Sequence, residues 1–249
     1  MIISIFSRKG GDKKTTTAAH IAHGLRRRGH RVLIVDLDQN GHAAITFGLD
    51  QAPGIAAWLN SVFEWFPSGL KTNDFIRPTG RPGLDILPGN DKTTNVLDNL
   101  SKEPTYLHRT IEAIKTLALP FDDVVIDTPP AGVLQEAAVA VASHIIAVVR
   151  CEVLSYVCLA DTMSVIGQLA TTNQIAILPT DFVASQTEHQ QYYTAIGTMY
   201  NNMVATPVMR TVAVPRSQGA GLTCYETSYD HSASVTLAYD RMIDWLIGE

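Results

Sequence analysis

The sequence has few residues of the kinds that build disulfide frameworks or metal centres. It contains three cysteines, Cys151, Cys158 and Cys224, and none of them forms a Cys-x-x-Cys pair. This spacing supports neither a disulfide framework nor a zinc site, so we expect buried free thiols in a reducing compartment. His20 and His23 do not form a ligand set on a helix, and we expect them to be ordinary surface or interface histidines.

Long apolar runs are also missing. No stretch approaches the roughly 20 residues of a membrane-spanning helix, and the N-terminus lacks the basic-then-apolar layout of a signal peptide. We therefore expect a cytoplasmic protein that does not contact a membrane. With 46% hydrophobic residues the chain can bury one large core, and we expect a single domain over residues 1–249.

Basic residues are scarce in the second half of the chain. Residues 116–249 carry 4 Lys and Arg against 13 Asp and Glu, whereas residues 1–115 carry 15 against 11. The run Arg26-Arg27-Arg28 is followed by Gly29 and is typical of a helix C-terminus, where cations favour the helix dipole. Contact with DNA phosphates is the alternative interpretation of this run.

Apolar strand-like segments alternate with helical ones along the chain. Several are continuous Val and Ile runs, which are typical of strands buried on both faces of a parallel sheet. The expected strands are Ile2–Phe6, Arg31–Asp36, Leu84–Leu87, Asp123–Asp127, Ile145–Val149, Gln174–Leu178 and Pro207–Val214. The expected helices span residues 15–28, 105–117, 133–142, 155–170, 187–201 and 232–247. This order predicts an α/β fold with a doubly wound, mostly parallel twisted sheet flanked by helices, and ligands at the carboxyl ends of the strands.

Residues 50–82 are the least regular part of the chain. They contain Trp58, Trp65 and Phe66 together with several prolines and glycines. We interpret them as a local aromatic cluster that covers the sheet edge, and a helical insertion or a partner-facing surface is the alternative.

The most informative segment is residues 8–17, Arg-Lys-Gly-Gly-Asp-Lys-Lys-Thr-Thr-Thr. It lies between an apolar run and a helical segment, and a strand, a glycine turn and a helix in this order can hold phosphate. Lys14 is expected to reach the β- and γ-phosphates, and Thr15 to ligate Mg²⁺ through its hydroxyl. Gly10 and Gly11 would let the backbone approach phosphate without a Cβ in the way.

Two later segments supply carboxylates, and the loop itself carries an additional lysine. Asp38 ends a strand candidate one helix after the loop, and we expect it to lie near the Mg²⁺ ion and to position or polarise the attacking water. Asp127 closes the run Val-Val-Ile-Asp-Thr-Pro-Pro and is expected in the Mg²⁺ shell, directly or through a water. Lys9 is not needed to hold one nucleotide and therefore indicates a nucleotide shared between two subunits.

These segments together resemble the ParA/MinD group of deviant P-loop ATPases, most closely the ParA branch without an N-terminal DNA-reading domain. The pattern Lys-Gly-Gly-x-x-Lys-Thr-Thr falls on Lys9 to Thr16, Val-Asp-x-Asp on Val35 to Asp38, and Ile-Asp-x-Pro-Pro on Ile126 to Pro130. The similarity continues through Ile177–Asp181 and Val214–Ser217, and so covers almost the whole chain.

The resemblance implies a fold of the SIMIBI type and a homodimer in which two subunits sandwich two ATP molecules with Mg²⁺. It implies that Lys9 reaches the phosphates bound by the other subunit, that Asp38 is needed for hydrolysis, and that Pro215 borders the adenine. The residues expected to contact the nucleotide are Gly10, Gly11, Asp12, Lys13, Lys14, Thr15, Thr16 and Pro215.

The chain departs from the family pattern within the loop. Family members usually have a third glycine where this chain has Lys13, preceded by Asp12. A side chain there is expected either to clash with the phosphate-binding backbone or to demand a φ value that lysine disfavours, and Asp12 brings a negative charge near an anion site. The sequence leaves open whether the loop is reshaped or weakened. Gln39-Asn40 replaces the usual Pro-Gln and bears on the rate of hydrolysis.

The resemblance also implies a function. We expect a slow ATPase, stimulated by a small ParB-like adaptor protein, that uses the nucleoid to position plasmid or chromosome DNA or a protein body such as the carboxysome. The changed loop is similar to that of the carboxysome-positioning, McdA-like branch. Relatives hold non-specific DNA through basic residues in the C-terminal half. Arg210, Arg216 and Arg241 are the candidates here, and we expect weak and salt-dependent binding.

Three alternatives remain. A MinD-like membrane switch would need a basic amphipathic C-terminal helix, but residues 234–249 carry only Arg241 against three acids and are expected to form a packed closing helix. A metal carrier of the nitrogenase iron protein or Mrp type would need a bridging cysteine pair, and Cys151 and Cys158 are too far apart for one helical turn. A nucleotide-binding dimer without turnover stays open because of the altered loop.

Overall fold

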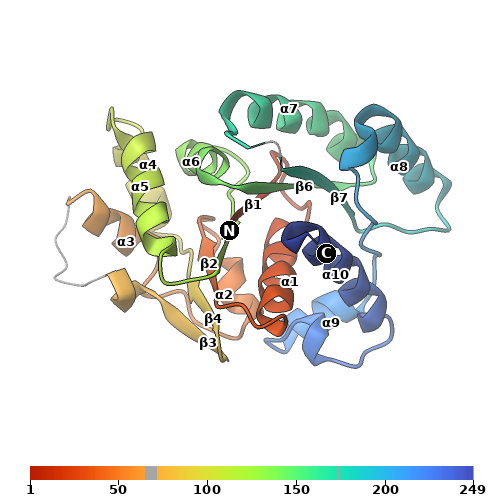
Figure 1. The fold of residues 1–249 in the computed structure, drawn as a ribbon, viewed down its shortest axis with the longest axis horizontal. Coiled ribbons are helices and arrows are strands. Elements are labelled where there is room, and N and C mark those ends of the chain that lie inside the picture. Colours follow the sequence, from red (N-terminus) through yellow and green to blue (C-terminus); the bar gives the residue numbers. More distant parts are fainter. Residues whose placement is uncertain (65–71, 173, 249) are drawn as a thin grey trace.

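The computed structural model describes residues 1–64, 72–172 and 174–248. Within these residues a seven-stranded sheet forms the centre of the molecule, and helices cover both of its faces (Figure 1). The strands are β1 (Ile2–Phe6), β2 (Val32–Asp36), β3 (Arg77–Arg81), β4 (Leu84–Leu87), β5 (Asp123–Asp127), β6 (His144–Arg150) and β7 (Ile175–Thr180). Their order across the sheet is β3-β4-β2-β5-β1-β6-β7, with β3 antiparallel to β4 and the other neighbours parallel. The predicted α/β fold with a mostly parallel sheet is confirmed.

The helices divide into two layers. One face of the sheet is covered by α1 (Lys14–Arg27), α2 (His42–Thr46), α9 (Ala213–Gly219) and α10 (Ser232–Ile247). The other face is covered by α3 (Ile55–Val62), α4 (Thr93–Leu100), α5 (Tyr106–Ala118), α6 (Val133–Val141), α7 (Val153–Leu169) and α8 (Thr187–Tyr200). Short 3₁₀ turns lie at η1 (Thr72–Phe75), η2 (Asn201–Met203) and η3 (Cys224–Glu226).

Strand β2 shows why the strand sequences are apolar without alternation. Val32 and Ile34 belong to the core cluster that contains α1 and α10, whereas Leu33 and Val35 belong to the cluster that contains α3 to α6. Both faces of the strand are therefore buried, as expected for a parallel sheet with helices on each side. Because β1, β5 and β2 are parallel neighbours, their carboxyl ends lie at the same edge of the sheet, where the loop of residues 7–13 begins.

The expected strand Pro207–Val214 is wrong. The segment runs beside the edge strand β7, where the N–H of Val208 donates to the carbonyl of Pro179 at 2.8 Å, and Met209 forms an isolated bridge with Phe182 just beyond the strand. These contacts do not make the segment a strand, and α9 starts at Ala213. Pro179 in β7 and Pro207 in the segment have no N–H to donate, so a continuous ladder cannot form. Strand β3 was not expected, because its sequence contains Pro78 and Gly80, two residue types that are uncommon in strands.

In the described part of the irregular region 50–82, α3 shares a core cluster with β4, and β3 pairs with β4 as the edge strand. Trp58 of α3 is buried and lies in one core cluster with Phe63 and Phe75, which agrees with the interpretation as an aromatic cluster. Trp65 and Phe66 lie outside the described residues.

The cationic end of α1 has the form expected of a helix C-terminus. Arg28 pairs with Asp244 of α10, and Gly29 takes a φ of +93°, which ends the helix. Cys151 and Cys224 are buried free thiols, and Cys158 is half-buried. None of the helices in the described part of the chain is long and apolar enough to cross a membrane.

His20 and His23 are not surface residues, contrary to expectation. Both are buried on α1, facing η3. The backbone N–H of Cys224 donates to Nε2 of His20 at 3.1 Å, so its Nδ1 carries the proton and donates to the carbonyl of Thr16 at 2.8 Å. The ring also stacks on Tyr239 of α10, with centroids 4.8 Å apart. His20 therefore joins α1 to η3 and α10 as a neutral imidazole, and its burial lowers its pKa to about 4.

A histidine buried in its neutral form makes stability depend on pH. The unfolded chain binds a proton at His20 near pH 6.5, whereas the folded chain does so only near pH 4, so stability is lost as pH falls through this window. Between pH 7 and pH 5 we expect His20 to lower the free energy of unfolding by about 2 kcal/mol. Urea denaturation at pH 7, 6 and 5 measures this. His20→Asn should be less stable at pH 7 and less sensitive to pH, and equal pH sensitivity of both proteins would contradict the account.

Candidate nucleotide-binding site

The predicted phosphate loop joins β1 to α1 in the expected order of strand, loop and helix. Gly11 has a φ of +87°, a left-handed conformation that glycine adopts without strain. Apart from each glycine and its chain neighbours, no described atom lies within 4 Å of the place that a Cβ would take at Gly10 or Gly11. The space beside both glycines is therefore open, as the approach of a phosphate group requires.

Asp12 fixes this loop to the rest of the molecule. Its side chain is 1% exposed, and its two carboxylate oxygens accept hydrogen bonds of 2.7 Å from the hydroxyls of Ser7 and Ser155. Its backbone carbonyl accepts a third, of 3.1 Å, from the hydroxyl of Thr180. Burial raises the pKa of Asp12, while the hydroxyls of Ser7 and Ser155 and the charges of Lys9 and Lys14 act in the opposite direction. The carboxylate thus serves as an anchor, and it is directed at two hydroxyls rather than at the open space beside the glycines.

Lys13 has the backbone conformation that the missing glycine would have had. Its φ is +70° and its ψ +29°, in the left-handed region, and its side chain is exposed at the start of α1. The expectation of a φ value that lysine disfavours is confirmed, and the exposed side chain rules out the expected clash. A left-handed conformation at an L-residue is unfavourable by about 1–2 kcal/mol.

Lys14 is directed inward beneath the loop. Its side chain is 7% exposed, and Nζ donates to the backbone carbonyl of Lys9 at 3.1 Å. Burial lowers its pKa, and the nearby carboxylates of Asp127 and Asp12 oppose this shift. An ammonium group with one hydrogen bond retains two donors for a ligand.

Lys9, in contrast, is held on the outer side of the loop. Its Nζ lies 2.7 Å from Oε1 of Glu152 and 2.8 Å from Oγ of Ser155, both at the start of α7. The pKa of Glu152 is lowered, first of all by this hydrogen bond from Lys9. Within the free chain, Lys9 therefore does not lie beside Lys14 as a second phosphate ligand, but is paired with a carboxylate of its own subunit.

Two carboxylates are buried side by side at the ends of β2 and β5. Asp36 pairs in register with Asp127, and both are 0% exposed. The oxygens of Asp36 accept from the backbone N–H groups of Asp38 at 3.0 Å and Ala43 at 3.1 Å. Asp36 thus shapes the turn that carries Asp38, a role that sequence analysis missed although Asp36 belongs to the Val-Asp-x-Asp pattern.

Asp127 has both oxygens buried without a hydrogen-bond partner among the described residues. Burial raises its pKa to about 7; the Thr15 hydroxyl and Lys14 lie close enough to favour the ionised form, but outside hydrogen-bond geometry. An unpartnered buried carboxylate next to a threonine hydroxyl fits a hard divalent cation such as Mg²⁺. The described residues contain no group of three His, Cys, Asp or Glu side chains that could hold a metal ion. Mg²⁺ bound by one or two carboxylates ordinarily completes its shell with waters and substrate phosphates.

Asp38 is the remaining predicted site carboxylate. It is half-buried, and its Oδ1 accepts from the backbone N–H of Asn40 at 2.9 Å and from the side-chain amide of Asn40 at 2.8 Å. The amide of Asn40, in the position where relatives carry glutamine, thereby orients the carboxylate. Its second oxygen has no hydrogen bond to any residue that the structure describes.

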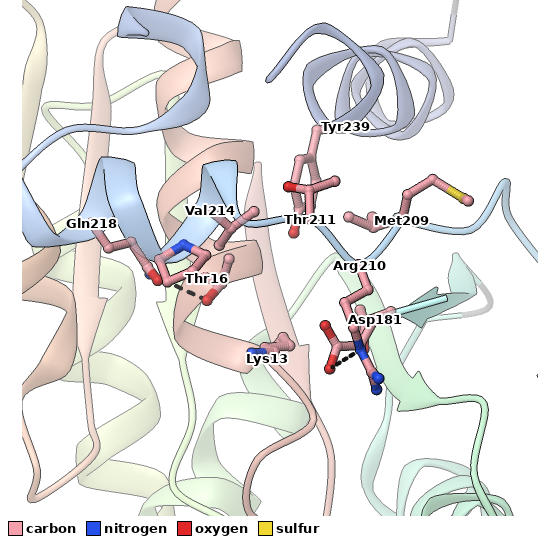
Figure 2. Close-up of a pocket in the computed structure, with 12 residues that line it drawn as sticks. Lys13, Thr16, Asp181, Met209, Arg210, Thr211, Val214, Gln218 and Tyr239 are labelled. Atoms are coloured by element: carbon pink, nitrogen blue, oxygen red, sulfur yellow. Dashed lines mark hydrogen bonds and ion pairs between the residues drawn. The ribbon is translucent and has the colours of Figure 1, made fainter. Parts of the chain in front are cut away.

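A cavity of about 260 Å³ lies on the other side of the start of α1 (Figure 2). Figure 2 shows Tyr239 of α10 at one end and Lys13 at the opposite end. The walls between them are lined by Thr16, Thr180, Asp181, Val208, Met209, Arg210, Thr211, Val214, Pro215 and Gln218. A cavity with both polar and apolar walls, next to a phosphate loop, is suited to a nucleoside, which has an apolar base face and polar edges. Pro215 lies in its wall, where the resemblance puts a residue bordering adenine.

Three polar residues around this cavity were not expected at the site, namely Asp181, Thr211 and Gln218. Arg210 pairs with Asp181 at 3.4 Å, and Gln218 donates to the hydroxyl of Thr16 at 3.2 Å. The hydroxyl of Thr211 is buried without a partner among the described residues. These residues lie far from the phosphate loop in the sequence, so no local pattern linked them to it. Asp181 could have been found, because it directly follows β7 and ligands bind at the carboxyl ends of the strands.

A strand, glycine loop and helix, with buried carboxylates on the two neighbouring strands, define a P-loop nucleotide-binding protein. Residues 1–177 match the family model described as an AAA domain, AAA_31, and the chain belongs to that family. Within it, the chain is a ParA/MinD-type P-loop ATPase of the partition and positioning group, and the predicted resemblance is confirmed.

Three known proteins illustrate the similarity. The chromosome partitioning protein ParA of Myxococcus xanthus is 30% identical over 152 residues, which cover 61% of this chain and 52% of that protein. The ATP complex of McdA from Cyanothece superposes with a TM-score of 0.85 at 16% identity, covering 99% of this chain and 96% of that one. The septum site-determining protein MinD of Pyrococcus horikoshii, complexed with Mg-ADP, has a TM-score of 0.78 at 19% identity, covering 99% and 97%.

These similarities differ in what they establish. At such low identity the two solved structures show a shared fold only. The chain spans 43% to 65% of the length of the first curated relatives that it matches, so their activities and partners do not transfer to it directly.

Replacing Lys13 tests the strain in the phosphate loop. Because glycine adopts the left-handed conformation without a Cβ penalty, Lys13→Gly should raise the free energy of unfolding by about 1 kcal/mol. Urea denaturation without nucleotide measures the change. Lys13→Val, with a β-branched side chain at the same φ, is the matched variant and should be less stable than the native chain. A glycine variant no more stable than the native chain would show that Lys13 carries no strain.

Proposed function

We propose that the chain is an ATP-driven dimerisation switch that positions or segregates a cargo inside the cell. The observation that carries the proposal is the separation of the two loop lysines. Lys14 is directed into the phosphate site of its own subunit, whereas Lys9 is held outside it by Glu152. A lysine placed outside its own site can serve the site of a second subunit, as the family resemblance implies.

The nucleotide would lie along the loop, with its base in the cavity beside Pro215. Lys14 would contact the β- and γ-phosphates, and the open backbone at Gly10, Gly11 and Lys13 would receive them. Thr15 and Asp127 would hold Mg²⁺, which when bound neutralises phosphate charge. Asp12 would act through the loop that it anchors, and Thr16 would border the nucleoside side.

Hydrolysis would depend on the placement of a water molecule by Asp38. Asp38 presents one carboxylate oxygen that Asn40 leaves unbound, and this oxygen could orient a water toward the γ-phosphate. Since the protein contributes mainly geometry and charge to such a reaction, we expect turnover to be slow until a partner orders the site.

The surface around Lys9 supports a second copy as the dimer partner. Val153, Leu154 and Val157 of α7 are 49%, 64% and 63% exposed, next to the two residues that hold Lys9. An exposed apolar patch of this kind is typical of an interaction site. A homodimer through this face would bring Lys9 of each subunit toward the phosphate loop of the other.

The cargo and the adaptor are proposed from the family resemblance. ParA of Myxococcus xanthus is a chromosome partitioning protein, so DNA is one proposed cargo and a protein body such as the carboxysome is the other. A small ParB-like protein would stimulate hydrolysis. Nucleoid contact would be weak, because Arg210 is engaged with Asp181 and only Arg216 and Arg241 are further candidates.

A MinD-like membrane switch is less well supported. The apolar face of α10, with Val235, Tyr239, Met242 and Ile243, is buried in the core cluster that includes α1. That face is therefore already occupied within the molecule, in agreement with a packed closing helix. A nucleotide-binding dimer without turnover differs from the proposal only in lacking hydrolysis.

The two loop lysines should give different phenotypes when each is replaced. Lys14→Ala should lose most nucleotide affinity, because it removes the cation inside the site. Lys9→Ala should bind a fluorescent ATP analogue as the native chain does, within about twofold, but should fail to dimerise with Mg-ATP. Fluorescence titration and sedimentation velocity measure the two properties.

Lys115→Ala on α5 serves as the charge-matched control, since Lys115 pairs with Glu112 within its own helix. It should behave as the native chain in both measurements. Loss of nucleotide affinity in Lys9→Ala to the same extent as in Lys14→Ala would place Lys9 in its own subunit's site and refute the proposal.

A further inference from the structure

A chain of charges runs from Lys9 to the wall of the nucleoside cavity. Oε1 of Glu152 lies 2.7 Å from Nζ of Lys9, and Oε2 of Glu152 lies 3.3 Å from Nη2 of Arg150. The same Nη2 of Arg150 lies 3.2 Å from Oδ2 of Asp181, and Asp181 in turn pairs with Arg210 at 3.4 Å. Five alternating charges thus connect the outer side of the phosphate loop with the cavity.

Arg150 occupies the centre of this chain because of its place in the sheet. It is the last residue of β6, in register with Thr180 at the end of β7, so it lies between Glu152 and Asp181, which both follow strand ends. Its side chain is 26% exposed, and its Nε is buried without a partner among the described residues. Arg150 is therefore held in place by two carboxylates and by the sheet rather than by solvent.

This arrangement affects how easily the side chain of Lys9 can leave Glu152. If Lys9 moves to the nucleotide of a partner subunit, Glu152 loses its closest cation. A partly buried carboxylate without a cation is unfavourable. Arg150 already lies on the other oxygen of Glu152, so the carboxylate stays paired after Lys9 has left, and no rearrangement of the backbone is required.

We propose that Arg150 is a positioning residue that keeps Glu152 paired when Lys9 moves to the partner's nucleotide, and so makes formation of the ATP-bound dimer easier. The inference rests on the proposed dimer switch. The mechanism acts through Glu152 alone. The contact of Arg150 with Asp181 fixes the guanidinium in place, and Asp181 retains Arg210 if Arg150 is lost.

Dimer dissociation constants in a hydrolysis-blocked Asp38→Ala background, with Mg-ATP, test this. Arg150→Met should raise the dissociation constant by about two- to fivefold, the range expected for one partly exposed ion pair. Glu152→Gln should lower it, because the amide holds Lys9 less firmly. The effect of Arg150→Met should disappear when Glu152→Gln is also present, and Arg150→Lys should restore part of the native value.

Arg31→Met is the matched control. Arg31 forms an exposed ion pair with Asp122 just before β2 and β5, at the opposite edge of the sheet, and its loss should leave dimerisation unchanged. Circular dichroism establishes that each variant is folded, and Arg150→Gln replaces Arg150→Met if the latter is not.

The outcomes separate this inference from the proposed function. A parent that stays monomeric with Mg-ATP would refute the dimer switch and this inference with it. A parent that dimerises, together with an Arg150→Met variant of equal affinity, would overturn the role of Arg150 alone. An effect of Arg150→Met that persists unchanged in the Glu152→Gln background would overturn it as well, since the effect would then run through Asp181.

Discussion

The anchoring of the phosphate loop by a buried carboxylate is the interaction on which the rest of the site depends. Asp12 accepts hydroxyl hydrogen bonds from Ser7 at the end of β1 and from Ser155 in α7, while Thr180 at the end of β7 holds its backbone. Three elements are thereby tied to one loop residue. Such a network can hold the next residue, Lys13, in a left-handed conformation that it would otherwise leave.

The same anchor determines where the two functional lysines lie. Ser155 donates to Asp12 and also receives Lys9, so the start of α7 is positioned against the loop from outside. Lys14 begins α1 and is buried on the inside, near Asp127. Lys14 thus lies on the side of the loop where we expect the nucleotide, and Lys9 lies on the opposite side, paired with Glu152. In our account, the exchange of Lys9 between Glu152 and a partner's phosphates is what links nucleotide binding to dimerisation.

The sequence predicted the parts of this arrangement that depend on local patterns. Continuous apolar runs identified β1 and β5, and the glycines and lysines of the loop identified the phosphate site. The φ value of Lys13 could be anticipated because a glycine is usual there. Pro207–Val214 was mistaken for a strand. Pro179 of β7 cannot donate a hydrogen bond to this segment, and the sequence does not show that the two adjoin.

The direction of side chains was harder to anticipate. Asp12 was expected near the anion, but it is turned toward hydroxyls contributed by β1 and α7. His20 was expected at the surface, yet η3 and α10, more than 200 residues further along the chain, enclose it. The pairing of Arg150 with both Glu152 and Asp181 depends on the register of β6 with β7, which no local pattern encodes.

In the proposed switch ATP, and not ADP, converts the free chain into a dimer. The most direct measurement is the mass in solution, by light scattering, of the Asp38→Ala variant with Mg-ATP and then with Mg-ADP. We expect the monomer mass of 27.1 kDa with ADP and twice that mass with ATP. The same mass with both nucleotides, in a folded protein shown to bind them, would contradict the claim and leave a nucleotide-binding protein without a switch.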